Sequence, residues 1–212
     1  MNPALRETGK VFRTMGDLIE GKEKLLKTAI DLFAAKGFRG TSIRDIAQAM
    51  GMSISNIYHY FGSKEGLLLA ILEESSQRLV YRLKEITQKD MEPLERFELL
   101  LETHIRISEA RMNEAKIFSL DEEHLSPEGN KVNRQIQREI LNIYLGELKT
   151  LKKSGHIHSR NLTVLAFNIF GTINWLLRWY RTDGALTLEQ ICREIISFIL
   201  YGVIGNKGNK SS

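Results

Sequence analysis

Apolar side chains recur along most of this chain every three or four residues, the spacing of helices that bury one face. Glycine, proline and small polar residues interrupt the pattern where helices would begin and end. Helices are therefore expected over residues 22–36, 41–50, 53–61, 63–88, 93–109, 126–153, 163–180 and 188–204. The stretch 112–125 is less regular. The fold class that this pattern predicts is all-α.

Two short helices after residue 40 carry the most informative pattern. The first ends at Gly51, because glycine enters the left-handed backbone region at little steric cost. Thr41 is the expected N-cap of the first helix, and Ser53 that of the second. The side chains expected to face inward are Ile43, Ile46, Ala47 and Met50, and then Ile54, Ile57 and Phe61. Two such helices joined by a tight turn form a helix-turn-helix.

The second of these helices has hydrogen-bonding side chains on its remaining faces: Ser55, Asn56, Tyr58, His59 and Tyr60. Such side chains reach phosphates and base edges when a helix lies in a major groove of DNA. The alternative is an ordinary helical hairpin in which the same residues only pack. The pattern favours DNA binding.

Charge and cysteine content are consistent with that interpretation. The 212 residues carry a net charge of +4, and residues 1–66 hold ten Lys and Arg against seven Asp and Glu. A mildly basic chain is compatible with nucleic acid without proving the interaction. Cys192 is the single cysteine, which excludes an intrachain disulfide and a cysteine-based zinc site. We expect Cys192 to pack in a core or an interface.

Other classes of site find little support in the sequence. Residues 16–23 imitate a phosphate-binding loop, but they lack its Ser or Thr and a preceding strand. His156 and His158 have no further metal ligands nearby in the sequence. We therefore expect no catalytic residues, no metal and no cofactor. The chain shows neither a signal peptide nor a bilayer-spanning run, so a cytoplasmic location is expected.

The last two helices are apolar on more than one face and therefore need burial on more than one face. Pairing with a second copy, two helices from each chain, is the economical solution and predicts a homodimer. Residues 1–20 lack periodicity and are expected to form a loose arm, either disordered or reaching a minor groove. Residues 206–212 are expected to be disordered.

The first 70 residues resemble the TetR family of bacterial transcriptional regulators. The matching segments are AIDLF at 29–33, KGF at 36–38, TSI at 41–43, IA at 46–47, GMS at 51–53, IYHYF at 57–61, SKE at 63–65 and LL at 67–68. The resemblance implies a homodimer with a three-helix DNA-binding head and a C-terminal domain whose inducer lowers DNA affinity. The domains expected are an arm at 1–20, a helix-turn-helix domain at 21–66, a ligand-binding and dimerisation domain at 67–205 and a tail at 206–212.

Carried over by position, the resemblance assigns phosphate contacts to Thr41, Ser42, Ser53, Tyr58, Tyr60 and Lys64, and base contacts to Ser55, Asn56 and His59. Helix N-termini and lysine suit phosphate, and an asparagine amide can bind adenine at two points. Tyr60 has the alternative of packing half its ring on the first helix. Two departures stand out: Asn56 is larger than the residue of many relatives, and Gly66 replaces an acidic residue that would complete a capping box with Ser63.

The C-terminal half is similar to regulators of fatty-acid, steroid and aromatic-acid degradation that sense acyl-CoA thioesters. The similarity lies at 171–181, at 183–189 and in the LSPE sequence at 125–128, with Thr182 where many relatives have proline. An acyl chain needs an apolar slot, and CoA phosphates need cations at its mouth. The ligand-binding candidates are Trp175, Arg178, Trp179 and Arg181. The alternative is that the two tryptophans, one helical turn apart, pack in an interface.

Together these features predict a homodimeric repressor that binds a palindromic operator in double-stranded DNA and is released by a small-molecule inducer. An acyl-CoA thioester is the expected inducer, and no membrane partner is expected. The alternatives are a regulator that responds to a hydrophobic drug, an architectural DNA binder without a ligand, and an enzyme that merely contains a helical hairpin.

Overall fold

The computed structural model describes residues 15–110, 112, 125–158, 161–181 and 183–204. Every regular element in those residues is a helix, which confirms the expected all-α fold. The helices are α1 (Met15–Gly40), α2 (Ile43–Met50), α3 (Ile54–Phe61), α4 (Lys64–Thr87), α5 (Pro93–Ala110), α7 (Pro127–Lys153), α8 (Leu162–Trp179) and α9 (Leu188–Ile204).

Most boundaries agree with the helices expected from the sequence, and one does not. α1 begins at Met15, so residues 15–20 belong to a helix and not to a loose arm. Residues 1–14 and 206–212, for which an arm and a tail were expected, lie outside the described residues, as does most of the stretch 112–125.

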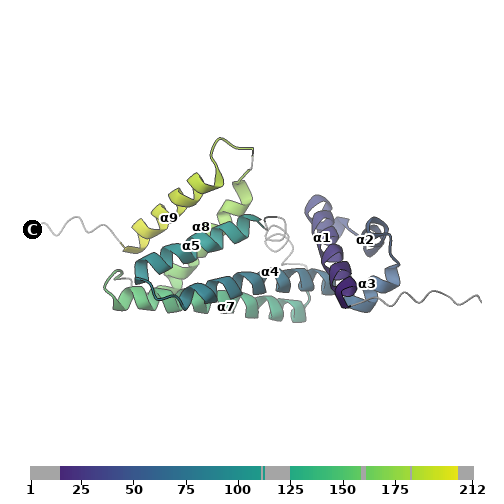
Figure 1. The fold of residues 1–212 in the computed structure, drawn as a ribbon, viewed down its shortest axis with the longest axis horizontal. Helices are drawn as coiled ribbons and strands as arrows, with labels where there is room; N and C mark the ends of the chain where they lie inside the picture. The colour runs from purple at the N-terminus through teal and green to yellow at the C-terminus, as the bar shows by residue number, and fades with distance from the viewer. Residues whose placement is uncertain (1–14, 111, 113–124, 159–160, 182, 205–212) are drawn as a thin grey trace, which may run out of the picture.

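Helices α1, α2 and α3 form a head at one end of the molecule (Figure 1). Their inner faces share one hydrophobic cluster, to which Phe33, Ile46 and Ile57 contribute fully buried side chains. Gly37 has a φ of 74° and breaks the helical geometry near the end of α1, so that the chain can turn towards α2. Buried leucine and isoleucine side chains from the first turns of α4 complete this cluster, so the head is a small domain that shares its core with the start of α4.

The N-cap of α2 is Ser42 and not Thr41, which corrects the expectation. Ser42 Oγ accepts a hydrogen bond from the Asp45 amide at 3.1 Å, and the Asp45 carboxylate accepts one from the Ser42 amide at 2.8 Å. This reciprocal capping box requires an acceptor three residues after the cap, and only Ser42 has Asp45 in that place.

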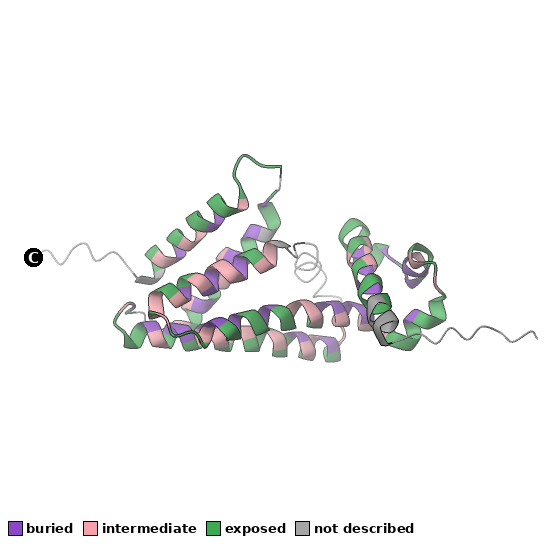
Figure 2. Cartoon of the chain, in the orientation of Figure 1, coloured by how far each residue is buried: buried purple, intermediate pink, exposed green. Residues whose placement is uncertain are grey.

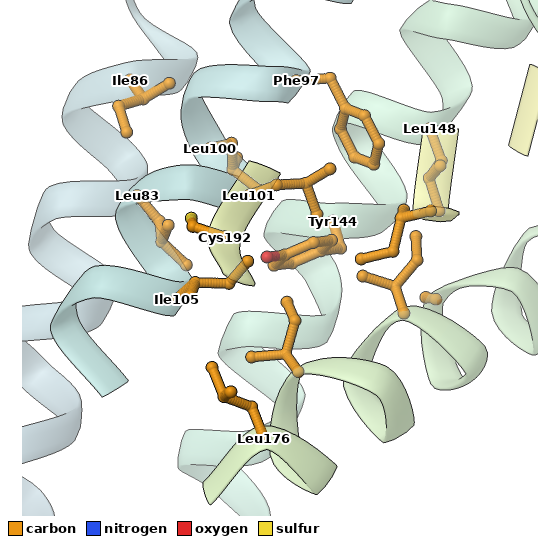
Figure 3. Packing of buried hydrophobic residues seen from close by; sticks show 14 of the residues in the cluster. Leu83, Ile86, Phe97, Leu100, Leu101, Ile105, Tyr144, Leu148, Leu176 and Cys192 are labelled. Atoms are coloured by element: carbon orange, nitrogen blue, oxygen red, sulfur yellow. The ribbon is translucent and has the colours of Figure 1, made fainter. Parts of the chain in front are cut away.

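The body consists of α4, α5, α7, α8 and α9. α4 leaves the head and runs beside α7 and α5, while α8 and α9 pack on α7 and α5 and on each other (Figure 1). Figure 2 shows the buried residues of these helices turned towards their neighbours. Figure 3 shows the ring of Tyr144 inside the cluster, near Leu101, Ile105 and Leu176.

None of the helices in the described ranges combines the length and the apolar character needed to cross a bilayer.

Candidate nucleic-acid interface

The surface of α3 is presented outward by three local features. Gly51 adopts the left-handed conformation with a φ of 63° and turns the chain from α2 towards α3. Ser53 caps α3 by accepting a hydrogen bond from the Asn56 amide at 3.3 Å. Ile57 is fully buried and anchors the helix on the head. The opposite side of α3 is thereby left open.

Most of the predicted DNA contacts lie on this open side. The exposed residues among them are Ser42, Ser53, Ser55, Asn56, Tyr58, His59 and Tyr60. The Tyr60 ring also touches the rings of His59 and Phe61, so half of it packs while half is exposed. The set is compatible with a helix that lies in a major groove. That these side chains contact DNA stays a prediction.

Ile54 lies on the same surface, although the sequence pattern placed it inward. Its side chain is 36% exposed, because α3 is short and Ile57 already fills the buried position. An exposed apolar side chain on a groove-facing helix can contact the methyl group of thymine. Arg44 is also exposed on α2 and is a cation of the head that the sequence pattern did not single out.

Thr41 does not lie on this surface. It is buried, and its hydroxyl lies 3.1 Å from the Leu32 carbonyl oxygen and 3.0 Å from that of Gly37. The hydroxyl that was assigned to phosphate therefore donates to carbonyl oxygens near the end of α1. The sequence could not show this, because Thr41 comes close to both carbonyls only after the chain turns at Gly37.

Ser42 is exposed, yet its donors are engaged within the capping box. Its hydroxyl lies 2.6 Å from Asp45 Oδ2, and its amide donates to the same oxygen. These two hydrogen bonds from Ser42 are the main reason that the pKa of Asp45 lies below its ordinary value. A phosphate contact by the Ser42 hydroxyl would have to compete with this ionised carboxylate.

The Lys64 side chain makes contacts within the head instead of pointing to solvent. Its Nζ donates to the carbonyl oxygens of Phe38 at 2.7 Å and Thr41 at 3.0 Å, and lies 4.2 Å from the centre of the Phe38 ring. The ammonium thus ties the first residue of α4 to the last turn of α1 and to Thr41, which follows it. In the sequence Lys64 was assigned to phosphate, and no local signal indicated these distant carbonyls.

Gly66 is required by a close approach of two backbone segments. Ser63 Oγ caps α4 by accepting from the Gly66 amide at 2.9 Å, as expected. A Cβ atom on residue 66 would lie only 2.0 Å from the Phe61 carbonyl oxygen. The departure from an acidic residue at this position therefore fits the tight turn between α3 and α4.

The four predicted ligand-binding residues lie on the outside of the described chain. Trp175 is 62% exposed and Trp179 47% exposed. Arg181 makes a two-point ion pair with Asp183, at 2.9 Å for each contact, and Arg178 is also exposed. This placement favours the alternative of interface packing for the tryptophans, and a ligand role stays a prediction.

The body instead buries polar groups that the sequence analysis did not single out. His104 Nδ1 lies 2.7 Å from the Tyr144 hydroxyl, and both side chains are buried beside the ring of Phe170. Burial lowers the pKa of His104 to about 4, so the imidazole is neutral at pH 7. Arg96 and Glu147 form an ion pair of 2.9 Å that is largely shielded from water. The partners in each pair lie tens of residues apart in the chain, so no local sequence pattern indicates that they meet.

A helix-turn-helix head with an open polar helix, mounted on a separate helical body, defines the protein as a DNA-binding regulator. Residues 25–71 match the family described as "Bacterial regulatory proteins, tetR family". Residues 90–203 match the family described as "Tetracyclin repressor-like, C-terminal domain". The chain belongs to the TetR family.

Individual relatives are similar to this chain over most of its length. The transcriptional repressor KstR2 of Rhodococcus jostii is 29% identical, over 86% of this chain and 90% of that protein. The regulator PfmR of Thermus thermophilus is 27% identical with a TM-score of 0.77, over 84% of this chain and 97% of that one. AibR, solved with isovaleryl coenzyme A and operator DNA, has the same fold, with 24% identity and a TM-score of 0.75 over 87% of this chain and 98% of that one.

Regulators of the TetR family dimerise and bind operator DNA, and this chain belongs to that family. The expectations of a homodimer and of a double-stranded DNA partner are thereby confirmed.

Proposed function

We propose that this protein is a repressor that leaves a palindromic operator when its body binds an acyl-CoA thioester. The observation that carries the proposal is α4, which begins in the head and packs along α7 and α5 in the body. A helix without a break transmits a displacement from one domain to the other. A ligand that changes the body geometry would therefore change the position of α3.

The palindrome follows from the symmetry of a homodimer. Two identical heads related by a two-fold axis meet identical half-sites, and two recognition helices fit successive major grooves when they lie about 34 Å apart. By thermodynamic linkage, DNA must lower the affinity for the inducer by the factor by which the inducer lowers the affinity for DNA.

The acyl-CoA assignment rests on similarity in the C-terminal half. The segments at 125–128, 171–181 and 183–189 resemble those of regulators that sense such thioesters. The related KstR2 is a repressor. AibR was solved with a CoA thioester, so the fold is able to hold one. A regulator of the same family that responds to a drug is the alternative that the test must exclude.

Two measurements test the proposal. Mass spectrometry of gently purified protein should detect a co-purifying acyl-CoA. Fluorescence anisotropy with a duplex selected from random sequences should then show release when that thioester is added, and no release with free coenzyme A. A bound lipophilic cation, or DNA binding that no thioester changes, would contradict the acyl-CoA assignment.

The base-reading role of Asn56 makes a further prediction. Asn56→Ala should weaken binding to the selected duplex by about 1–3 kcal/mol and relax sequence preference, because a side-chain amide reads a base edge at two points. Gln77→Ala, an exposed position on α4 away from the head, is the matched control. Equal losses on selected and random duplexes would mean that Asn56 does not read sequence.

A further inference from the structure

The start of α4, which is buried in the cluster of the head, is bound to the N-terminus of α7. The Glu65 carboxylate, in the first turn of α4, accepts a hydrogen bond from the Ser126 amide at 2.6 Å. Ser126 is itself the N-cap of α7 and accepts from the Gly129 amide at 3.1 Å. Carboxylates are favoured at helix N-termini by the unpaired amides and the helix dipole. The start of α7 is thus bound to the start of α4.

Packing around this hydrogen bond shows a close fit. Gly129 is buried, and a Cβ atom placed there would lie 2.6 Å from Glu65 Oε1. Leu125, the residue before the cap, belongs to the hydrophobic cluster of the head and not to that of the body. The Leu125 carbonyl oxygen accepts from Asn130 Nδ2 at 2.9 Å, which ties Leu125 back to α7.

The remainder of α7 belongs to the body. Tyr144, Leu148 and Leu151 are fully buried in the body cluster, far along the same helix from Gly129. In Figure 1 the end of α7 nearest the head is its N-terminal end. One helix therefore touches the head at its first turn and the body core along its second half.

We propose that Glu65 is a positioning residue for DNA binding: by holding the first turn of α7, it fixes the orientation of the head on the body. The first turns of α4 are buried in the cluster of the head, so a contact that holds them against α7 also fixes how the head lies on the body. A shift of α7 along the body would be passed to the head through Glu65. Only this last step rests on the proposed function, since it requires a ligand that moves α7.

The test measures the distance between the two heads of the full-length dimer by pulsed electron–electron double resonance between spin labels. A spin label on Lys24→Cys, an exposed position of α1, marks each head, and protein without this substitution shows whether buried Cys192 takes label. In the parent we expect one narrow distance distribution. In Glu65→Ala and Gly129→Ala we expect a distribution at least twice as wide.

Matched controls separate the contact from general effects. Gly146→Ala changes α7 at a position where an added Cβ meets nothing within 4 Å, and Glu73→Ala removes an exposed carboxylate from α4. Both should keep the narrow distribution. Glu65→Gln retains an oxygen acceptor for the Ser126 amide and should restore most of the narrow distribution that Glu65→Ala loses.

DNA affinity supplies an independent readout. If head orientation limits the binding-competent fraction to about a tenth, affinity for a selected duplex falls about tenfold. We expect that loss in Glu65→Ala and Gly129→Ala, with helical content and thermal midpoint close to those of the parent. Gly129→Ala displaces only the end of a flexible side chain, so it tests the contact even if Glu65→Ala does not fold.

Distributions of equal width in parent, Glu65→Ala and Gly129→Ala would overturn the inference, as would loss of helical content in both variants. These results do not depend on any inducer. If no acyl-CoA releases the DNA while the label distances behave as expected, the proposed ligand is wrong and the positioning role of Glu65 stands.

Discussion

At the scale of single residues, Lys64 shows how one charged side chain can serve the fold where a sequence motif assigns it to DNA. Its ammonium contacts two main-chain carbonyls and an aromatic face inside the head. A partly buried carbonyl that loses such a donor costs free energy, because water does not fully replace the hydrogen bond.

Lys64→Met should therefore lower the free energy of unfolding of the head by about 1–3 kcal/mol, since the apolar stem is kept while the donors are lost. Urea unfolding followed by circular dichroism measures the change, with Lys27→Met, an exposed position on α1, as the control. A variant as stable as the control that still binds all DNA sequences more weakly would show that Lys64 acts mainly on phosphate.

His104 makes stability depend on pH in the body. Burial lowers its folded-state pKa to about 4 from an ordinary value of 6.5, so the unfolded chain binds the proton more readily. This contribution to stability is fully present above pH 6.5 and is lost as the pH falls from 6.5 to about 4. The loss over that window amounts to about 3 kcal/mol.

His104→Gln should flatten the dependence of unfolding free energy on pH between 6.5 and 4. Urea unfolding at fixed protein concentration measures it, because dimer stability depends on concentration. His59→Gln, which removes an exposed histidine of α3, should retain the slope of the parent. Parallel curves for parent and His104→Gln would mean that the pKa of His104 is the same in the folded and the unfolded protein.

At the scale of elements, the junction of α3 and α4 depends on a glycine in the first turn of a helix. Phe61 ends α3, and its carbonyl oxygen approaches Gly66 so closely that a side chain would collide with main chain. Main chain yields less readily than the end of a side chain, so the junction admits little else at this position.

Gly66→Ala should lower the free energy of unfolding by about 1–3 kcal/mol, as overpacking does elsewhere. Gly146→Ala should raise it by about 0.5–1 kcal/mol, because alanine is the better helix former and an added Cβ there meets nothing within 4 Å. Thermal or urea unfolding measures both. Stabilisation by Gly66→Ala would show that the close approach relaxes freely.

At the scale of the whole molecule, α8 and α9 leave large apolar side chains uncovered. On α8 they include Val164, Phe167, Trp175 and Trp179, which follow one another at helical spacing, and on α9 they include Phe198 and Tyr201. Apolar surface of this kind marks an interaction site. We expect the partner protomer to cover this surface, because the apolar character of the last two helices predicts that they pair with those of a second copy.

Phe198→Asp should convert the dimer to monomer at micromolar concentration, because a charge would be buried in an apolar interface. Sedimentation velocity measures the mass. The control is Tyr81→Asp, which alters an aromatic side chain on α4 that is 61% exposed, against 69% for Phe198. A dimer that persists in Phe198→Asp and dissociates in Tyr81→Asp would place the interface elsewhere.

The sequence by itself determined the helices and the DNA-binding head. Helix bounds such as Leu188–Ile204 follow from local signals, because hydrogen bonds within a helix and its caps join residues only three or four positions apart. The helix-turn-helix was predictable for the same reason, since its apolar spacing, its turn glycine and its polar face all lie within twenty residues.

Only the tertiary structure decided which groups outside their own helices these residues touch. Thr41 faces carbonyls of α1, Lys64 reaches Phe38, Glu65 holds Ser126, and His104 meets Tyr144. Each of these contacts depends on how helices lie against one another, and no periodicity in the chain records that arrangement. A hydroxyl or an ammonium has the same local pattern whether it faces phosphate or a carbonyl, so its role is decided by the packing that surrounds it.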